Sequence, residues 1–276
     1  MSATWHGGEA PPPRRLGPGD WIRVVMRGTA ILGLLAVCFP ALLILRLPER
    51  LIFGMERPLT PRITQFVCVM ACAILGLRRE MRGLPMTGPG AYVANHVGWL
   101  DIFVLNACKR LYFVAKSEVA GWPGIGWLAR GTGTVFIARD PKQAAAQTRV
   151  FEDRLRAGHR LLFFPEGTST DGRRVLPFKT TLFQAFLSER LRDVVRIQPV
   201  TLVYHPPEGG HPAFYGWWGY MALGPAILAT LAAPRQGRVE VVYHTPVRVA
   251  DFGDRKTLAA MAEAEVRGGF PPDRLA

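Results

Sequence analysis

The chain has 276 residues, of which 49% are hydrophobic and 20% are charged, and its formal net charge is +13. This length provides for one full domain and an appendage, and the positive charge fits an anionic membrane surface or an acidic partner protein. Nucleic acid is excluded as a partner, because the arginines are scattered and no base-stacking aromatic residues alternate with them.

Two apolar segments near the amino terminus predict a membrane-associated helical hairpin. Residues 1–20 are rich in Pro and Gly, which predicts a disordered tail. As helices, residues 28–45 would span about 27 Å and residues 63–77 about 22 Å, and arginines flank both. We therefore assign residues 21–82 to a hairpin that crosses the bilayer twice or is immersed in one leaflet. Two core helices of a soluble domain are the alternative.

The first motif joins a predicted strand, residues 90–94, to a predicted buried helix that begins near Trp99. On one continuous helix, His96 and Asp101 would lie about 140° apart. In a strand-to-helix turn they can meet, and the helix dipole favours a carboxylate at Asp101. Asp101 would then orient His96 as a general base for a hydroxyl. A capping histidine and an unrelated first-turn charge would give the same pattern.

The second motif follows another predicted strand, residues 160–164, and contains Glu166, Gly167, Thr168 and Ser169. Glycine lets the backbone approach a ligand closely, and successive amides in such a turn bind anions. Glu166 would hold a substrate hydroxyl or an arginine. Taken alone, the motif is also consistent with an ordinary polar loop after a strand.

Strands and helices alternate through the rest of the chain. Further strands are predicted at residues 111–115, 134–137, 200–204 and 239–243, and helices at 180–191 and from Asp140 onward. The last strand is predicted as an edge strand, and residues 122–128 as a Gly/Pro-broken connection. The pattern predicts an α/β fold with a mostly parallel central sheet flanked by helices. Residues 214–233 are apolar with clustered Trp and Tyr, which favours an interfacial helix or a channel lining over a membrane span.

Cysteine and the remaining histidines give no catalytic signal. The four cysteines have no metal-site spacing to histidine, and we expect no disulfide, no metal and no cofactor. His159 is predicted to lie in a surface turn. His205, His211 and His244 have no partner at a telling spacing.

The two motifs together carry a resemblance to a known family. Asn95-His96-x4-Asp101, followed by Phe164-Pro165-Glu166-Gly167-Thr168, resembles the glycerolipid acyltransferase family, typified by bacterial 1-acyl-glycerol-3-phosphate acyltransferase. Residues 133–139, ending in Arg139, are similar to the family block that contacts the head group of the acceptor. Residues 197–200 are similar to its apolar proline block near the acyl pocket. The resemblance places an acyltransferase domain at residues 83–276, on the cytoplasmic face of the inner membrane.

The resemblance also implies a mechanism. His96, oriented by Asp101, takes a proton from the acceptor hydroxyl of a lysolipid. The oxygen attacks an acyl carrier protein or acyl-CoA thioester without an acyl-enzyme intermediate. The substrate-binding residues that it implies are Asn95, Arg139, Glu166, Gly167, Thr168 and Ser169.

Ser169 departs from the family pattern, which has an arginine for the phosphate of the acceptor at this place. A serine offers one neutral hydrogen bond where arginine offers a charged fork, and Arg173 or Arg174 would have to substitute. The stretch from Glu166 to Lys179 resembles the lyso-ornithine lipid acyltransferase branch, whose acceptor hydroxyl is on a 3-hydroxy fatty acyl chain. We favour that acceptor, with lysophosphatidate as the alternative.

Two other classes of function remain open. His96, Asp101 and Glu166 would be ligands in a metal-dependent hydrolase, which needs a further strong ligand that the sequence does not offer. A non-catalytic membrane-binding protein on the same scaffold is the other alternative.

Overall fold

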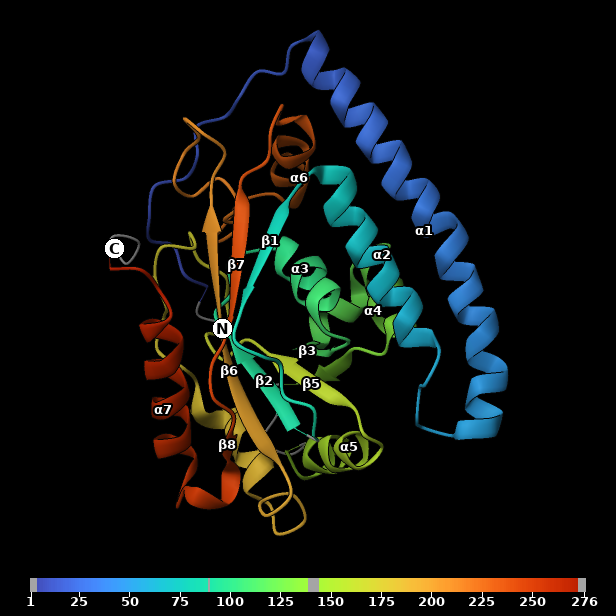
Figure 1. Cartoon of the computed structure of the whole chain (residues 1–276), viewed down its shortest axis with the longest axis vertical. Helices are drawn as coiled ribbons and strands as arrows, with labels where there is room; N and C mark the ends of the chain where they lie inside the picture. Colours follow the sequence, from blue (N-terminus) through green and yellow to red (C-terminus); the bar gives the residue numbers. More distant parts are fainter. Residues whose placement is uncertain (1–3, 89, 139–143, 273–276) are drawn as a thin grey trace.

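The computed structural model describes residues 4–88, 90–138 and 144–272, and within them an eight-stranded sheet forms the centre. Its strands are β1 (Arg78–Arg82), β2 (Gly90–Ala94), β3 (Tyr112–Lys116), β4 (Val135–Ile137), β5 (Arg160–Phe163), β6 (Arg196–His205), β7 (Arg238–Tyr243) and β8 (Val247–Arg248). They lie in the order β1-β7-β6-β2-β5-β3-β4, with β8 beside β6. β7 and β8 run antiparallel to β6, and the other neighbouring pairs are parallel. The predicted mostly parallel sheet is confirmed (Figure 1).

Helices cover both faces of the sheet. They are α1 (Pro18–Phe53), α2 (Thr60–Leu75), α3 (Leu100–Cys108), α4 (Ile125–Thr132), α5 (Ala144–Arg156), α6 (Leu223–Ala232) and α7 (Arg255–Gly268), with 3-10 helices η1 (Ser117–Gly121), η3 (Thr180–Leu187) and η4 (Val249–Asp251). Side chains alternate along β2, so Tyr92 and Ala94 join the core under α2 and α3, whereas Ala91 and Val93 join the core under α5, η3 and α7. The central strands are therefore buried on both faces.

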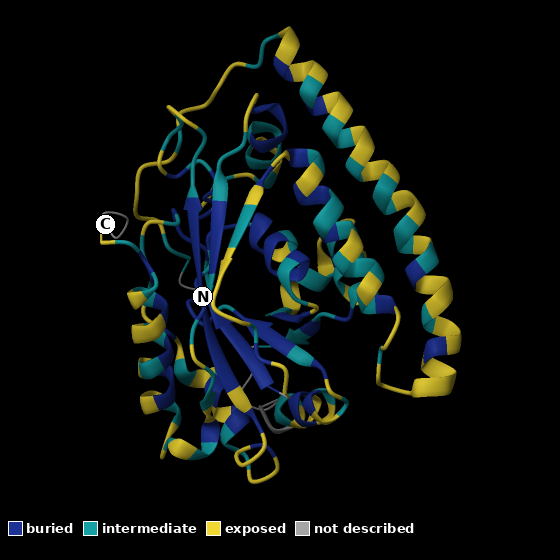
Figure 2. Ribbon diagram, in the orientation of Figure 1, coloured by how far each residue is buried: buried dark blue, intermediate teal, exposed yellow. Residues whose placement is uncertain are grey.

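α1 is one continuous 36-residue helix, twice as long as the apolar segment that predicted it. In the described part of the chain it is the one helix long and apolar enough to cross a membrane, judged by length and composition. Its most apolar stretch of 18 residues has a mean hydropathy of 2.4, and only 6% of that stretch is buried. Figure 2 shows α1 largely exposed along its length, while the central strands of the sheet are buried.

Charged side chains fix both ends of α1 to other helices. Arg23 donates to the carbonyl oxygen of Ala232 at 2.8 Å, and Arg27 donates to the carbonyls of Leu231 and Ala233, so both guanidinium groups bind the carboxyl end of α6. At the other end, Glu49 accepts hydrogen bonds from the backbone N–H groups of Leu59 and Thr60 and from the Thr60 hydroxyl. α1 therefore lies along the domain and is anchored at each end.

Several local predictions need correction. β1 pairs with β7, so β7 is flanked on both sides and is not an edge strand, and the sheet begins within the segment assigned to the hairpin. Residues 180–187 form the 3-10 helix η3 rather than a longer α-helix. Residues 122–128 include the start of α4. In contrast, the preference against a membrane span within residues 214–233 stands, because the helix α6 occupies only Leu223–Ala232, which is too short for a span.

Candidate active site

Two loops meet at the carboxyl ends of β2 and β5, which are neighbouring parallel strands. His96 lies in the turn between β2 and α3, and the loop containing Glu166 follows β5. The backbone N–H of Thr170 donates to the carbonyl of His96 at 2.9 Å, which joins the loops. Carboxyl ends of parallel strands are where such sheets bind ligands.

His96 and Asp101 meet as predicted. Nδ1 of His96 lies 2.7 Å from Oδ2 of Asp101, and Asp101 is fully buried in the first turn of α3. The imidazole stacks on Phe164, with ring centroids 4.0 Å apart. The histidine side chain remains 21% exposed, and no described protein group bonds its Nε2. An imidazole held at Nδ1 and open at Nε2 is positioned to accept a proton from a substrate.

Three further donors hold the Asp101 carboxylate. The backbone N–H groups of Val97 and Gly98 donate to Oδ2 at 2.7 and 3.1 Å. The hydroxyl of Tyr204, at the end of β6, donates to Oδ1 at 2.9 Å. Burial and the nearby Asp101 carboxylate raise the pKa of Tyr204, so its hydroxyl stays protonated as a donor. The sequence gives no signal for this role of Tyr204 beyond its place at the end of a predicted strand.

Glu166 supports His96 and does not face a ligand. Its Oε1 accepts the backbone N–H of His96 at 2.7 Å, and its Oε2 accepts the N–H of Leu176 at 2.8 Å. The side chain is 2% exposed. Burial raises the pKa of Glu166 to about 8, although the two N–H donors act in the opposite direction. Glu166 therefore fixes the backbone of the base.

Asn95 and Gly167 also serve the backbone. The Asn95 amide is fully buried, donates to the carbonyl of Leu202 and accepts the N–H of Leu202 at 3.0 and 2.8 Å. It extends the ladder between β2 and β6 by one rung, so it is not a substrate ligand in this arrangement. Gly167 has a φ of +69°, and a Cβ there would lie 2.6 Å from Nζ of Lys179. The positive φ is what requires glycine here, because the Lys179 side chain could move aside.

Ser169 and Thr168 face other protein segments. The Ser169 hydroxyl donates to the carbonyl of Trp217, and the residue is 8% exposed. The N–H of Trp217 in turn donates to the carbonyl of Val97 at 3.0 Å. Residues 213–221, called the 213–221 loop below, therefore lie over both catalytic loops. The Oγ1 of Thr168 accepts the N–H of Trp5 at 3.4 Å.

The two arginines that follow the Glu166 loop differ in their partners: the Arg174 side chain is paired, whereas Arg173 is exposed. Arg174 pairs with Asp171 through Nε and Nη2, at 2.9 to 3.2 Å. Arg173 is exposed, and its backbone N–H donates to Asp171. Arg139 lies outside the described residues.

The amino-terminal segment, residues 4–8, packs on this site, and α1 begins at Pro18, which corrects the prediction of a disordered tail for these parts of residues 1–20. The Trp5 ring lies 5.7 Å from the Trp218 ring, and the Arg174 guanidinium lies 5.0 Å from the Trp5 ring centroid. His6 stacks on Tyr220 at 4.3 Å.

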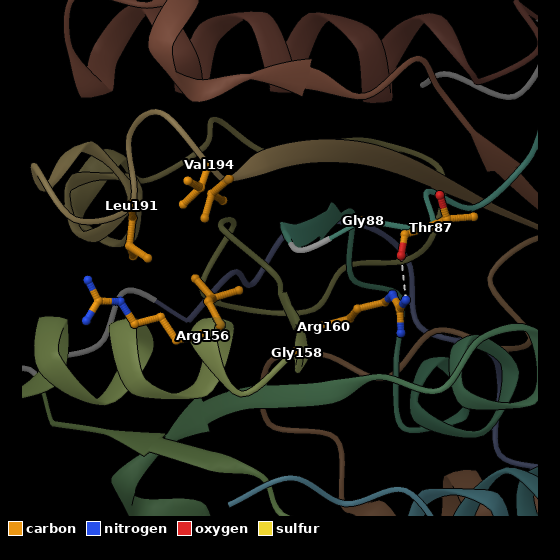
Figure 3. A pocket seen from close by; sticks show the side chains of 9 residues that line it. Thr87, Gly88, Arg156, Gly158, Arg160, Leu191 and Val194 are labelled. Atoms are coloured by element: carbon orange, nitrogen blue, oxygen red, sulfur yellow. Dashed lines mark hydrogen bonds between the residues drawn. The ribbon is translucent and has the colours of Figure 1, made fainter.

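A hollow of about 410 Å³ lies at the opposite end of the sheet (Figure 3). Thr87, Arg156, Arg160 and Val194 are among its lining residues, and Arg160 donates to the carbonyl of Thr87 at 2.6 Å. These residues lie near the amino ends of β2 and β5, so the hollow is separate from His96.

The other histidines serve the fold. His159 is buried against Tyr112 rather than in a surface turn, and burial beside Arg154 and Arg57 lowers its pKa to about 3. His205 lies 2.7 Å from Glu240, and His244 bonds Thr201 at 2.8 Å. Both partners are distant in the sequence, so spacing could not reveal them.

Comparison with known proteins gives the family. A model of the family described as Acyltransferase matches residues 78–203, from β1 to β6, which contain both loops. A lyso-ornithine lipid O-acyltransferase of Rhodobacter capsulatus is 56% identical over 266 residues, covering 96% of this chain and 96% of the relative. The chain belongs to the acyltransferase family. This acyltransferase is also 31% identical over 207 residues to a 1-acyl-sn-glycerol-3-phosphate acyltransferase of Neisseria gonorrhoeae, covering 74% of the chain and 78% of the relative.

A solved structure supports the fold. The 1-acyl-sn-glycerophosphate acyltransferase PlsC from Thermotoga maritima matches this acyltransferase with a TM-score of 0.57 and 21% identity, over 91% of this chain and 95% of that one. As an acyltransferase, the protein requires an acyl donor and an acyl acceptor. The carboxylates of Asp101 and Glu166 are taken by protein N–H and O–H donors, which leaves the metal-dependent alternative without these two ligands.

Proposed function

We propose that this acyltransferase moves a fatty acyl chain from an acyl thioester to the hydroxyl of lyso-ornithine lipid, with His96 as the general base. The observation that carries the chemistry is the 2.7 Å hydrogen bond between His96 and the fully buried Asp101. Acyl carrier protein or acyl-CoA supplies the thioester.

The proton transfers follow from the orientation of the imidazole. Asp101 accepts a hydrogen bond from Nδ1–H of His96, which leaves Nε2 unprotonated and free to take the proton of the acceptor hydroxyl. The hydroxyl oxygen attacks the thioester carbonyl carbon, a C–O bond forms, and the C–S bond breaks as the tetrahedral intermediate collapses. The imidazolium then returns its proton to the departing thiolate. The acyl group passes directly to the acceptor.

The choice of acceptor rests on the head-group side of the site. Ser169 donates its hydroxyl to Trp217, and Arg174 is paired with Asp171. A phosphate is best bound by an unpaired arginine, and neither Ser169 nor Arg174 offers one, which leaves exposed Arg173 as the remaining arginine of this segment. The Rhodobacter relative is named for lyso-ornithine lipid, which agrees. Lysophosphatidate is the second candidate, because the Neisseria relative is named for it and Arg139 keeps its place in the family block.

We also propose that α1 and α2 form a hairpin immersed in the cytoplasmic leaflet of the inner membrane. At 36 residues α1 would be about 54 Å long, whereas the apolar core of a bilayer is about 30 Å thick. Both of its ends bond the domain, at α6 and at α2. A helix anchored in this way lies along the membrane surface, and the acyl donors are cytoplasmic.

The test is acyl transfer by the purified full chain, offered lyso-ornithine lipid and lysophosphatidate in parallel with an acyl carrier protein thioester. We expect transfer to lyso-ornithine lipid. Transfer to lysophosphatidate alone would replace the proposed acceptor and leave the base assignment standing.

The base assignment has its own variants. We expect His96→Ala to lower kcat by at least about 100-fold, because general base catalysis contributes that much, and Asp101→Ala to lose activity similarly. Membrane association, measured by vesicle flotation, should persist in both. Unchanged lipid product in cells that carry only His96→Ala would favour a non-catalytic membrane-binding protein, whereas unchanged kcat of the purified variant would overturn the base assignment.

A further inference from the structure

Around the Asp171–Arg174 pair, three segments distant in the sequence come together beside the catalytic loops: residues 4–8, residues 168–174 and the 213–221 loop. Asp171 is buried, whereas Arg174 is about one-third exposed. The Trp5 ring lies 5.0 Å from the Arg174 guanidinium and 5.7 Å from the Trp218 ring. Gly8 has a φ of +80°, and a Cβ there would lie 2.9 Å from Oδ2 of Asp171. The segment therefore follows a path fixed by glycine.

Arg174 keeps binding capacity for one anionic group. Its Nε and Nη2 bond Asp171, and within the described residues Nη1 has no hydrogen-bond partner. Trp5 and Asp171 together hold the guanidinium in place. Because Asp171 offsets its charge, the pair is neutral overall and is suited to a singly charged carboxylate rather than to a phosphate dianion.

An aromatic surface lies next to the Trp5 backbone, on the segment that packs against this pair. Tyr220 is 93% exposed, and one face of its ring is covered by His6, the neighbour of Trp5. Gly219 has a φ of +61°, and a Cβ there would lie 3.3 Å from the ring of His6. A large exposed aromatic ring attracts ammonium groups through its π face.

We propose that this cluster is the head-group subsite for a carboxylate–ammonium zwitterion, with the carboxylate on Nη1 of Arg174 and the ammonium on the face of Tyr220. This inference rests on the proposed function, because an ornithine head group with an acylated α-nitrogen carries one carboxylate and one side-chain ammonium. Trp5 is a positioning residue for Arg174. The subsite lies beside the loop that holds His96, where the head group must be while the hydroxyl is acylated.

The test compares three acceptors with the full chain: lyso-ornithine lipid, the same lipid with norvaline in place of ornithine, and the same lipid with ornithinamide. The second lacks the ammonium and the third lacks the carboxylate. We expect each loss to lower kcat/KM of the unmodified enzyme by about tenfold, chiefly through KM.

Two substitutions separate the two contacts. Arg174→Gln should no longer distinguish ornithine from ornithinamide while still distinguishing ornithine from norvaline, and Tyr220→Ala should show the reverse. Trp5→Ala should weaken the carboxylate preference, and Trp5→Phe should restore part of it. Trp127→Ala, an exposed tryptophan of α4, is the matched control and should keep both preferences.

The outcomes separate the two proposals. If the unmodified enzyme acylates lyso-ornithine lipid but Arg174→Gln and Tyr220→Ala keep its preferences, the subsite is wrong and the function stands. If it acylates lysophosphatidate alone, the proposed function fails, and the zwitterion subsite fails with it. Thermal unfolding of each variant separates a lost contact from a lost fold, and exposed Tyr220 has little part in the core.

Discussion

The carboxylate of Asp101 accepts four hydrogen bonds, and only one of them comes from His96. The other three fix both oxygens, so the carboxylate cannot turn away from the imidazole without losing several partners at once. In a buried site each unmade bond of this kind costs more than a neutral surface bond. The base is therefore oriented before any substrate binds.

Tyr204 is expected to contribute to this orientation. Tyr204→Phe removes the donor to Oδ1 of Asp101, and we expect kcat to fall by about tenfold with KM nearly unchanged, because a hydrogen bond to a charged group contributes roughly 1.5–3 kcal/mol. Tyr243→Phe is the matched control, since its buried hydroxyl has no hydrogen-bond partner in the described structure. Equal kcat values for the two variants would contradict the role of Tyr204.

Glu166 makes the free energy of unfolding depend on pH. Its pKa is about 8 in the folded chain and about 4.3 when unperturbed, so between these values the folded state holds a proton that the unfolded state has released. Stability should therefore fall as the pH rises through this window and level off above pH 8.

Urea unfolding at several pH values checks this. Glu166→Gln removes the titrating group, so the free energy of unfolding of this variant should change less with pH. The variant should also be less stable overall, because one of the two N–H groups of His96 and Leu176 loses its acceptor. Parallel pH profiles for the two proteins would show that Glu166 is ionised in the fold.

The sequence predicted His96 and Asp101 as partners but not the tasks of Asn95 and Glu166. His96 and Asp101 are five residues apart with a turn between them, and because this arrangement is local, their pairing could be recognised from the motif alone. Whether an Asn or Glu side chain faces a ligand or the backbone of another strand depends on contacts such as Asn95 with Leu202, which lie 107 residues apart. The contact between Trp5 and Thr168 spans 163 residues and has no sequence signal either.

Strands and helices with a strong apolar pattern could be predicted from the sequence, whereas the polar strand β1 and the helix α4, which follows Gly and Pro, could not. β2, β5 and β6 were recognised because they are buried on both faces and read as apolar runs. β1 has the sequence RREMR and no such pattern, so β7 was taken for an edge strand. α4 was missed because Gly and Pro precede it.

α1 is the element on which membrane association should depend. Val37 and Ile44 are 71% and 66% exposed on its surface. We expect Val37→Glu together with Ile44→Glu to reduce vesicle binding by more than about tenfold, since a charge in the apolar layer costs roughly 2.5–3.5 kcal/mol. Activity on acceptor dispersed in detergent should persist. Val194→Glu, an exposed apolar site away from α1, should bind vesicles as the unmodified protein does.

For the whole molecule, the net charge of +13 and the apolar surface of α1 both favour binding to an anionic membrane. Vesicles containing anionic lipid should bind the protein more tightly at low salt, and raising the salt to about 1 M should reduce binding, because the Debye length falls to about 3 Å. Binding to neutral vesicles should change little. Sedimentation of both vesicle types across a salt series measures the difference, and equal salt dependence would contradict an electrostatic contribution.

Trp5 rests against Thr168 of the catalytic loop, so any polypeptide fused ahead of it must leave the molecule beside His96. A purification tag there would compete with the substrate for space and could change the measured acceptor preference. α7 packs on the opposite face of the sheet from α3. Tags fused after α7 are therefore the better choice for comparing acceptors, and an amino-terminal tag should be cleaved before kinetic work.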